Sequence, residues 1–216
     1  YSVRRSAPGE SVRLSDGLTD PLNVTQVHAL SPTDGRVVFE VSDGARFHYL
    51  FSVPATGGAP VLIDAVEQHF FGFHAPAQVT PDGSRVVYRR GPDYELCSAP
   101  IEGGPIVVLS LTASQRVHTF QLSPDGSVAV YIAPGEFGAV FERYRGPVDG
   151  SAPPLRRNLP LSGERDVTPN AFQISPDGTH VVYLADQTVN DMVELWSVPL
   201  AGGERPERLN SVLPTT

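Results

Sequence analysis

Two histidines and three phenylalanines crowd one short, loop-like stretch of the chain. His69 and His74 flank this stretch, which also contains Phe70, Phe71 and Phe73. Imidazole is a common metal ligand, and an aromatic pocket beside it could bind a small ligand. Two histidines with no third ligand in view also fit a loop that tucks its phenylalanines onto the core. We favour this second interpretation and expect no metal and no cofactor.

Catalytic motifs are absent from the sequence. It contains no Gly-x-Ser-x-Gly elbow, no His-Glu-x-x-His, no Walker loop and no Gly-x-Gly-x-x-Gly. Four aspartates recur along the chain and could form an acidic ring: Asp34, Asp82, Asp125 and Asp177. Each precedes a glycine in a turn where its carboxylate can bond to the nearby backbone, so we assign them a turn role. We therefore expect no catalytic residue in the chain.

Charge and composition exclude several classes of function. The formal net charge is −8, which argues against a nucleic-acid partner or an anionic membrane surface. No apolar run approaches the length of about 18 residues that a membrane span needs, so we expect no membrane insertion. Cys97 lies in an apolar strand pattern and is expected to be a small buried side chain. Arg89-Arg90 and Arg156-Arg157 are expected to be solvated loop charges rather than an anion site.

The elements that position these residues come from a repeat. Phe120–Tyr131 reads as a strand, a Ser-Pro-Asp-Gly turn and a second strand, and three similar copies have turn glycines at positions 35, 83 and 178. Proline presets φ for the turn, aspartate bonds to the backbone, and glycine accepts a positive φ. A third strand, a Gly-rich turn and a short fourth strand follow in each copy. The fourth strands are marked by Leu62, Leu109, Leu155 and Leu209. Four strands at a period of roughly 40–50 residues indicate the blade of a propeller.

We predict an all-β chain, a β-propeller of four-stranded antiparallel blades with about four and a half blades present, as an incomplete ring. Residues 1–15 form a half blade, and the full blades span 23–64, 74–110, 117–159 and 168–210. We expect a segment of a longer propeller, or a partial ring that another chain completes. The chain starts at Tyr1 and its only methionine is Met192, so we expect the natural start to lie elsewhere. Open strand edges and an apolar last face predict self-association.

Polar residues recur on the first strand of the blades. Gln78, Gln121 and Gln173 each lie two residues before the turn Ser or Thr. They could form a polar ring near a central channel, or hydrogen-bond between blades, and we favour the second role. His118 and Asn170 share an earlier position on this strand but differ in type. Since groups that bind a specific ligand should differ between blades, these two are the better candidates for contacts in a channel.

The repeat resembles the WD40-like (PD40) β-propeller repeat of the TolB family. The shared pattern is an apolar strand, Ser-Pro-Asp-Gly, a strand ending in an aromatic residue, a Leu-aromatic strand, Gly-Gly and a terminal Leu. It covers nearly all of residues 27–210 and the half blade at 1–15. The departures are the inserted Thr33 and the Asp149-Gly150 pair in place of Gly-Gly. The resemblance implies a periplasmic or secreted protein.

Three functions follow from the resemblance. The first, which we expect, is a non-catalytic scaffold that binds a protein or peptide, as TolB-like propellers do. The second is the gating propeller of a larger prolyl-oligopeptidase-type hydrolase whose catalytic domain lies outside this chain. The third is a lyase-type or metal-binding propeller that uses channel histidines.

Overall fold

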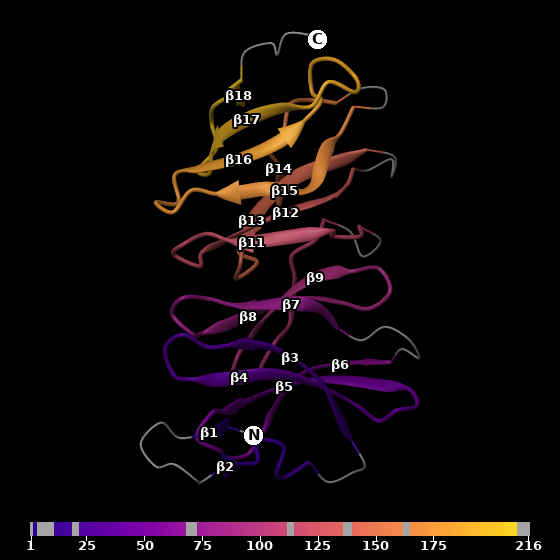
Figure 1. Cartoon of the computed structure of the whole chain (residues 1–216), viewed down its shortest axis with the longest axis vertical. Helices are drawn as coiled ribbons and strands as arrows, with labels where there is room; N and C mark the ends of the chain where they lie inside the picture. The colour runs from indigo at the N-terminus through magenta and orange to yellow at the C-terminus, as the bar shows by residue number, and fades with distance from the viewer. Residues whose placement is uncertain are drawn as a thin grey trace. The chain divides into compact units, whose positions relative to one another are not determined.

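The structure is a computed structural model, and β-strands make up its regular secondary structure (Figure 1). It describes residues 2–3, 11–18, 22–67, 73–111, 115–135, 140–161 and 165–210. Within these ranges there is no helix that is long and apolar enough to cross a membrane. The chain divides into two compact units, Tyr1–Val108 and Leu109–Thr216, and each is described by itself.

The first unit contains a two-stranded sheet and two four-stranded sheets. The short sheet consists of β1 (Ser2–Val3) and β2 (Ser11–Val12). The next sheet consists of β3 (Asn23–Leu30), β4 (Arg36–Ser42), β5 (Phe47–Pro54) and β6 (Val61–Glu67). The last sheet of this unit consists of β7 (Phe73–Val79), β8 (Arg85–Arg90), β9 (Glu95–Pro100) and β10 (Val107–Val108).

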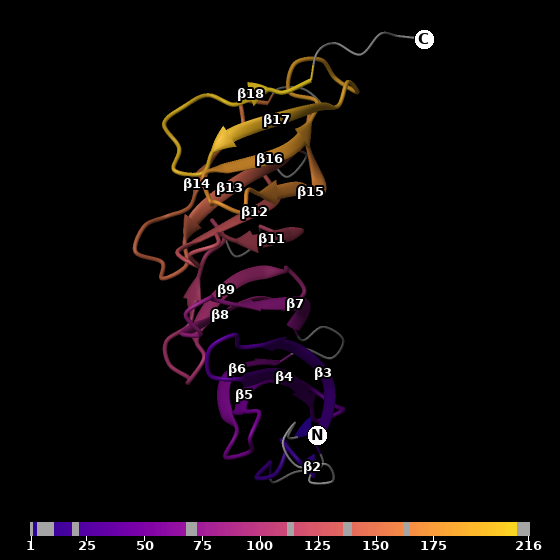
Figure 2. The ribbon, with the colours of Figure 1, turned by 60° about the vertical axis from the view of Figure 1, so that its left-hand side comes forward.

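The second unit contains two further four-stranded sheets. One consists of β11 (Thr119–Leu122), β12 (Val128–Pro134), β13 (Phe141–Pro147) and β14 (Leu155–Arg156). The other consists of β15 (Val167–Ile174), β16 (His180–Ala185), β17 (Glu194–Pro199) and β18 (Glu207–Arg208). In all four sheets each strand pairs antiparallel with the next strand in sequence, so every sheet is a simple meander (Figures 1 and 2).

The Ser-Pro-Asp-Gly turn joins the first two strands of a sheet as its residue types predict. Asp125 accepts hydrogen bonds from the Ser123 hydroxyl at 2.5 Å and from the Ser127 amide at 3.0 Å, and Gly126 has a φ of 74°. The bond from Ser123, followed by those from Ser127, lowers the pKa of Asp125. Equivalent bonds lower the pKa of Asp82 and of Asp177 to about 2. These carboxylates therefore hold the turns together, as the sequence predicted.

The core of each unit lies between its two four-stranded sheets. Alternate residues of a strand face opposite sides, so one side of each central strand can pack against the neighbouring sheet. In the first unit Val38 packs with Val86 and Tyr88, and in the second Val130 packs with Val181. All of these side chains are buried. Burial of each such side chain stabilises the fold by about 1.5–3 kcal/mol, which makes contact between sheets the main source of stability.

Candidate functional site

The histidine and phenylalanine cluster predicted at residues 69–74 is not a single loop. Phe73 and His74 belong to β7, which corrects their assignment to a loop, while His69, Phe70 and Phe71 lie outside the described residues. The Phe73 side chain is buried and contacts the ring of Tyr88 edge-on at a centroid distance of 5.6 Å. Phe73 is thus a core residue, because the strand begins early enough to carry it between the sheets.

Metal binding finds no support in the part of the chain that the structure describes. There, no three His, Cys, Asp or Glu side chains converge in a way that could hold a metal ion. Cys97 is fully buried, as predicted, and its burial raises the pKa of the thiol. A buried thiol with a raised pKa is a poor nucleophile, which agrees with a packing role for this residue.

His118 and Asn170 have different local environments. The exposed His118 donates its backbone amide to Ile132 at 2.8 Å, and its ring meets Phe141 edge-on at 4.6 Å. Asn170 is exposed and has a φ of 62°, within the irregular part of β15 where the pairing with β16 shifts register. Asparagine tolerates this left-handed conformation, which gives a backbone reason for its presence. Their role in ligand binding stays a prediction.

Gln121 joins the two sheets of the second unit. Its side-chain amide donates to the Phe172 carbonyl at 3.2 Å, and its oxygen accepts from the Ile174 amide at 3.2 Å. These two backbone groups lie on β15, so one glutamine satisfies two groups of the next sheet. This is the role between blades that we favoured for the recurring glutamines. Gln78 holds the equivalent place on β7, where it is half-buried and opposite Val87.

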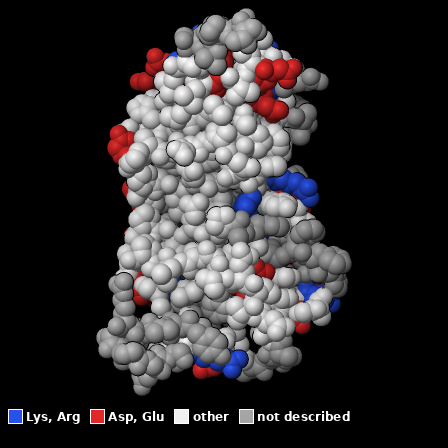
Figure 3. All heavy atoms as spheres, viewed as in Figure 1, with Lys and Arg blue, Asp and Glu red and all other residues white. Residues whose placement is uncertain are grey.

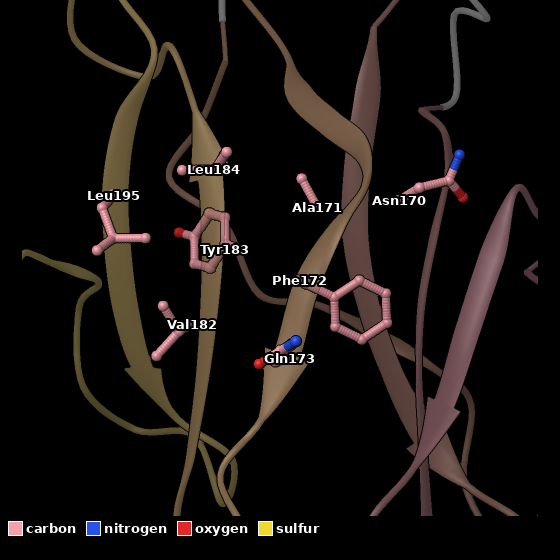
Figure 4. Close-up of a pocket in the computed structure, with 8 residues that line it drawn as sticks. All are labelled: Asn170, Ala171, Phe172, Gln173, Val182, Tyr183, Leu184 and Leu195. Atoms are coloured by element: carbon pink, nitrogen blue, oxygen red, sulfur yellow. The ribbon is translucent and has the colours of Figure 1, made fainter.

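In the last sheet, β15–β18, the face equivalent to the one that carries Gln121 is not packed against another described sheet. Gln173, equivalent to Gln121, is exposed, and Val182 and Leu184 are only half-buried. Their counterparts in the previous sheet, Val130 and Ile132, are 0 % exposed. A hollow of about 320 Å³ lies over this face. Figure 4 shows Gln173, Val182 and Leu195 on neighbouring strands, with Phe172 pointing to the other side of β15.

The Gln121 bonds should contribute measurably to stability. We expect Gln121→Ala to lower the free energy of unfolding by about 1–2 kcal/mol, because a half-buried carbonyl and amide lose their partners. Gln173→Ala is the matched control and should change it by less than about 0.5 kcal/mol, since this side chain is exposed. Urea unfolding followed by the fluorescence of Trp196, the only tryptophan, measures both. Equal effects of the two substitutions would contradict the assignment.

The first unit has an exposed apolar surface of its own. Val24, Val27 and Leu30 of β3 are 49, 65 and 64 % exposed. They line a hollow of about 410 Å³ together with Leu14 and Phe39. Exposed apolar groups that gather around a hollow are typical of a surface that binds another protein.

Two buried carboxylates of the first unit were not found from the sequence. Glu40 lies between the rings of His28 and His48, whose nitrogens are 3.1 and 2.6 Å from its two oxygens. Asp64 accepts from the Tyr88 hydroxyl at 2.8 Å and from Arg90 at 3.0 Å. Both carboxylates are 5 % exposed. These partners lie on different strands, so only the strand register brings them together.

The arginine pair at positions 89 and 90 also differs from the expectation. Both residues lie in β8 rather than in a loop, and both are half-buried. Arg90 pairs with Asp64 and with Glu95, the latter at 2.9 Å. On the face seen in Figure 3, the described charged side chains lie in small separate groups on a mostly uncharged surface. This face offers no broad basic patch to a nucleic acid.

Two solved protein structures are similar to this chain in architecture. No protein-family model and no curated protein sequence matches the chain. A crystal structure of TolB from Acinetobacter baumannii is similar, with a TM-score of 0.51 and 13 % identity over 88 % of this chain and 43 % of TolB. A prolyl endopeptidase structure is similar with a TM-score of 0.58 and 14 % identity, over 87 % of this chain and 28 % of the other.

The chain has a β-propeller fold. Its four four-stranded antiparallel sheets are blades of that fold and the two-stranded sheet is part of a further blade, which gives about four and a half blades among the described residues, as the repeat predicted. The chain spans less than half of the TolB chain and less than a third of the prolyl endopeptidase chain. At these identities the similarity shows the propeller fold alone.

Proposed function

We propose that the chain is a non-catalytic, TolB-like β-propeller scaffold that binds protein through the exposed face of β15–β17. The observation that carries this proposal is the contrast between two equivalent faces of the second unit. One is sealed by the next blade through Gln121, Val130 and Ile132, while the other leaves Gln173 and Val182 accessible. The similarity to TolB supports a scaffold of this type, and we propose a periplasmic or secreted location with it.

The partner that we propose for this face is a second copy of the chain. The face offers the half-buried side chains of Val182, Leu184 and Leu195, and burial of each gains up to about 1.5–3 kcal/mol. Gln173 can supply the same pair of hydrogen bonds to a strand backbone that Gln121 makes. A second copy can supply a strand edge and an apolar surface, including the exposed side chains of β3. Contact between unlike surfaces of identical chains gives closed rings or open filaments.

Sedimentation velocity over a wide range of protein concentration tests this proposal. We expect oligomers whose fraction rises with concentration. Leu184→Asp should shift the population toward monomer, because it places a charge in the apolar contact. Ser151→Asp is the control, since it adds the same charge in an exposed turn. A monodisperse wild-type monomer at every concentration, or equal oligomerisation of Leu184→Asp and wild type, would contradict self-association through this face.

The similarity to a prolyl endopeptidase favours one alternative function. In that case the chain is a propeller segment that gates access to a catalytic domain encoded elsewhere in the same gene. DNA sequencing on both sides of this coding segment distinguishes the two proposals. A Gly-x-Ser-x-Gly strand-turn-helix unit in the adjoining sequence would favour the hydrolase. Further Ser-Pro-Asp-Gly units without another domain would favour the scaffold.

A further inference from the structure

Three arginines of the second unit lie on one face of the β13–β14 hairpin: Arg143 and Arg145 in β13, and Arg157 directly after β14. Arg143 and Arg145 are two residues apart on β13, so their side chains point to the same side. Tyr144 pairs with Arg156, which places Arg157 directly opposite Arg143, and the Arg157 amide donates to the Arg143 carbonyl at 2.8 Å. Like charges directly opposite each other in a sheet are destabilising. An oppositely charged group beside the three arginines would offset this repulsion.

The equivalent positions of the other blades carry no such charge. Arg143 corresponds to a leucine in each of the other three four-stranded sheets: Leu50, Leu96 and Leu195. Arg145 corresponds to a serine in each: Ser52, Ser98 and Ser197. Arg157 corresponds in the last sheet to Leu209, whose amide donates to Leu195 in the same way. Among the described residues, the third blade alone concentrates three guanidinium groups at these sites.

Burial makes this concentration of charge costly. Arg143 is 0 % exposed, and its Cζ atom lies 5.0 Å from the ring centre of Tyr183. Its Nε atom and that of Arg157 are buried and have no hydrogen-bond partner in the described part of the chain. Burial, together with repulsion from Arg157 and Arg145, lowers the pKa of Arg143 to about 10. A buried charge of this kind is tolerated only when other groups compensate it.

Among the described residues, acidic partners are missing on this side of the sheet. No described aspartate or glutamate forms an ion pair with any of the three arginines. On the opposite side, by contrast, Arg156 pairs with the buried Glu142 at 2.7 Å. The expectation that Arg156 and Arg157 are solvated loop charges is therefore wrong, because Arg156 lies in β14 and Arg157 is half-buried. Arg156 is a paired strand residue, whereas Arg157 is half-buried and forms no ion pair with a described residue.

The turn between β17 and β18 brings two of the guanidinium groups together. Arg145 donates to the carbonyl oxygens of Leu200 and Ala201. The guanidinium of Arg157 lies against the next residue, since a Cβ atom built on Gly202 would be 2.7 Å from its Cζ. Arg143 donates to the Arg157 carbonyl, which ties the third arginine to the same place. Consecutive residues of one turn thus hold Arg145 and Arg157 side by side.

We propose that Arg143, Arg145 and Arg157 form a binding site for an oxyanion, a phosphate or carboxylate group. Guanidinium forks match the geometry of both groups and bind them through paired, charge-assisted hydrogen bonds. Arg157 provides the main contact, because it is half-buried and its side chain has no hydrogen-bond partner among the described residues. The turn holds Arg145 beside Arg157. The positive charge of the buried Arg143 adds electrostatic attraction for the anion. The site is independent of the apolar face proposed for self-association.

Calorimetric titration of the full chain tests the site with two probes, sodium phosphate and sodium acetate, in chloride buffer of matched ionic strength. We expect saturable binding of at least one anion, and the probe that binds more tightly identifies the phosphate or carboxylate group. Arg157→Leu should weaken it by about tenfold or more, because a charge-assisted bond contributes roughly 1.5–3 kcal/mol. This variant introduces the residue found at the equivalent place in the last blade, so it should fold.

Arg205→Leu is the matched control for charge. Arg205 is exposed in the turn between β17 and β18, and its loss changes the net charge by the same amount. We expect this variant to bind with wild-type affinity. Arg143→Leu, a second test, should also weaken binding without loss of the fold, since three other blades have leucine there. No saturable heat with either anion, or equal affinity in wild type and Arg157→Leu, would overturn the proposal.

Discussion

Replacement of Asp64 by alanine is expected to lower the free energy of unfolding of the first unit by about 3–5 kcal/mol. The carboxylate is 5 % exposed and lies between the Tyr88 hydroxyl, at 2.8 Å, and Arg90, at 3.0 Å. Its loss leaves the hydroxyl of a fully buried tyrosine without its acceptor. It also leaves Arg90 with Glu95 as its remaining acidic partner among the described residues. Removal of one member of a buried charged network destabilises a protein by more than the intact network stabilises it, because the remaining groups stay buried without a partner.

Glu67→Ala is the matched control, because Glu67 lies on the same strand but pairs with Arg46 at the surface. An exposed pair of this kind contributes at most about 1 kcal/mol. Urea unfolding followed by far-ultraviolet circular dichroism measures both variants. Trp196 lies in the second unit, so an unchanged tryptophan transition would assign the loss to the first unit. A cost for Asp64→Ala no larger than that for Glu67→Ala would contradict the argument.

The turns of this fold could be predicted because their chemistry is local. Ser123, Asp125 and Gly126 lie within four residues, and the bonds between them do not depend on the rest of the chain. The alternation of buried and exposed residues beside each turn then indicates strands. Because the turn and the alternating pattern both repeat along the chain, together they predict a blade and its approximate length. The recurring glutamine was visible for the same reason, since it keeps a fixed distance from the turn.

The charged sites depend on strand register and could not be predicted. The repeat predicts Leu155 as the leucine of the fourth strand, but Leu155 pairs with Arg145 and so takes the place that Glu207 has in the last blade. Pairing of Leu155 with Arg145 shifts Arg157 opposite Arg143. His28 likewise lies where the pairing of β3 with β4 shifts register, which turns its ring toward Glu40. A shift of one residue changes the face of every later side chain, so sequence spacing alone does not show these contacts.

Glu40→Gln is expected to lower the free energy of unfolding by about 3 kcal/mol at neutral pH. Glu40 accepts from His28 at 3.1 Å and from His48 at 2.6 Å, and the ring of His28 is completely buried. Burial by itself would raise the pKa of Glu40, but the hydrogen bonds from both histidines outweigh it and hold the pKa below the ordinary value of 4.5. The amide keeps the shape of the side chain but loses the charge that these bonds stabilise.

Because the pKa of Glu40 is lowered in the folded state, the difference in unfolding free energy between wild type and Glu40→Gln depends on pH in a defined way. A carboxylate with a lower pKa in the folded state stabilises the fold above its unfolded pKa, and this stability is lost as the pH falls through the folded value. The difference between wild type and Glu40→Gln should therefore be constant at neutral pH and shrink progressively below pH 4.5. Urea unfolding at a series of pH values measures it, with the exposed Glu67→Gln as control. Parallel curves for wild type and Glu40→Gln down to acidic pH would show that the charge of Glu40 does not stabilise the fold.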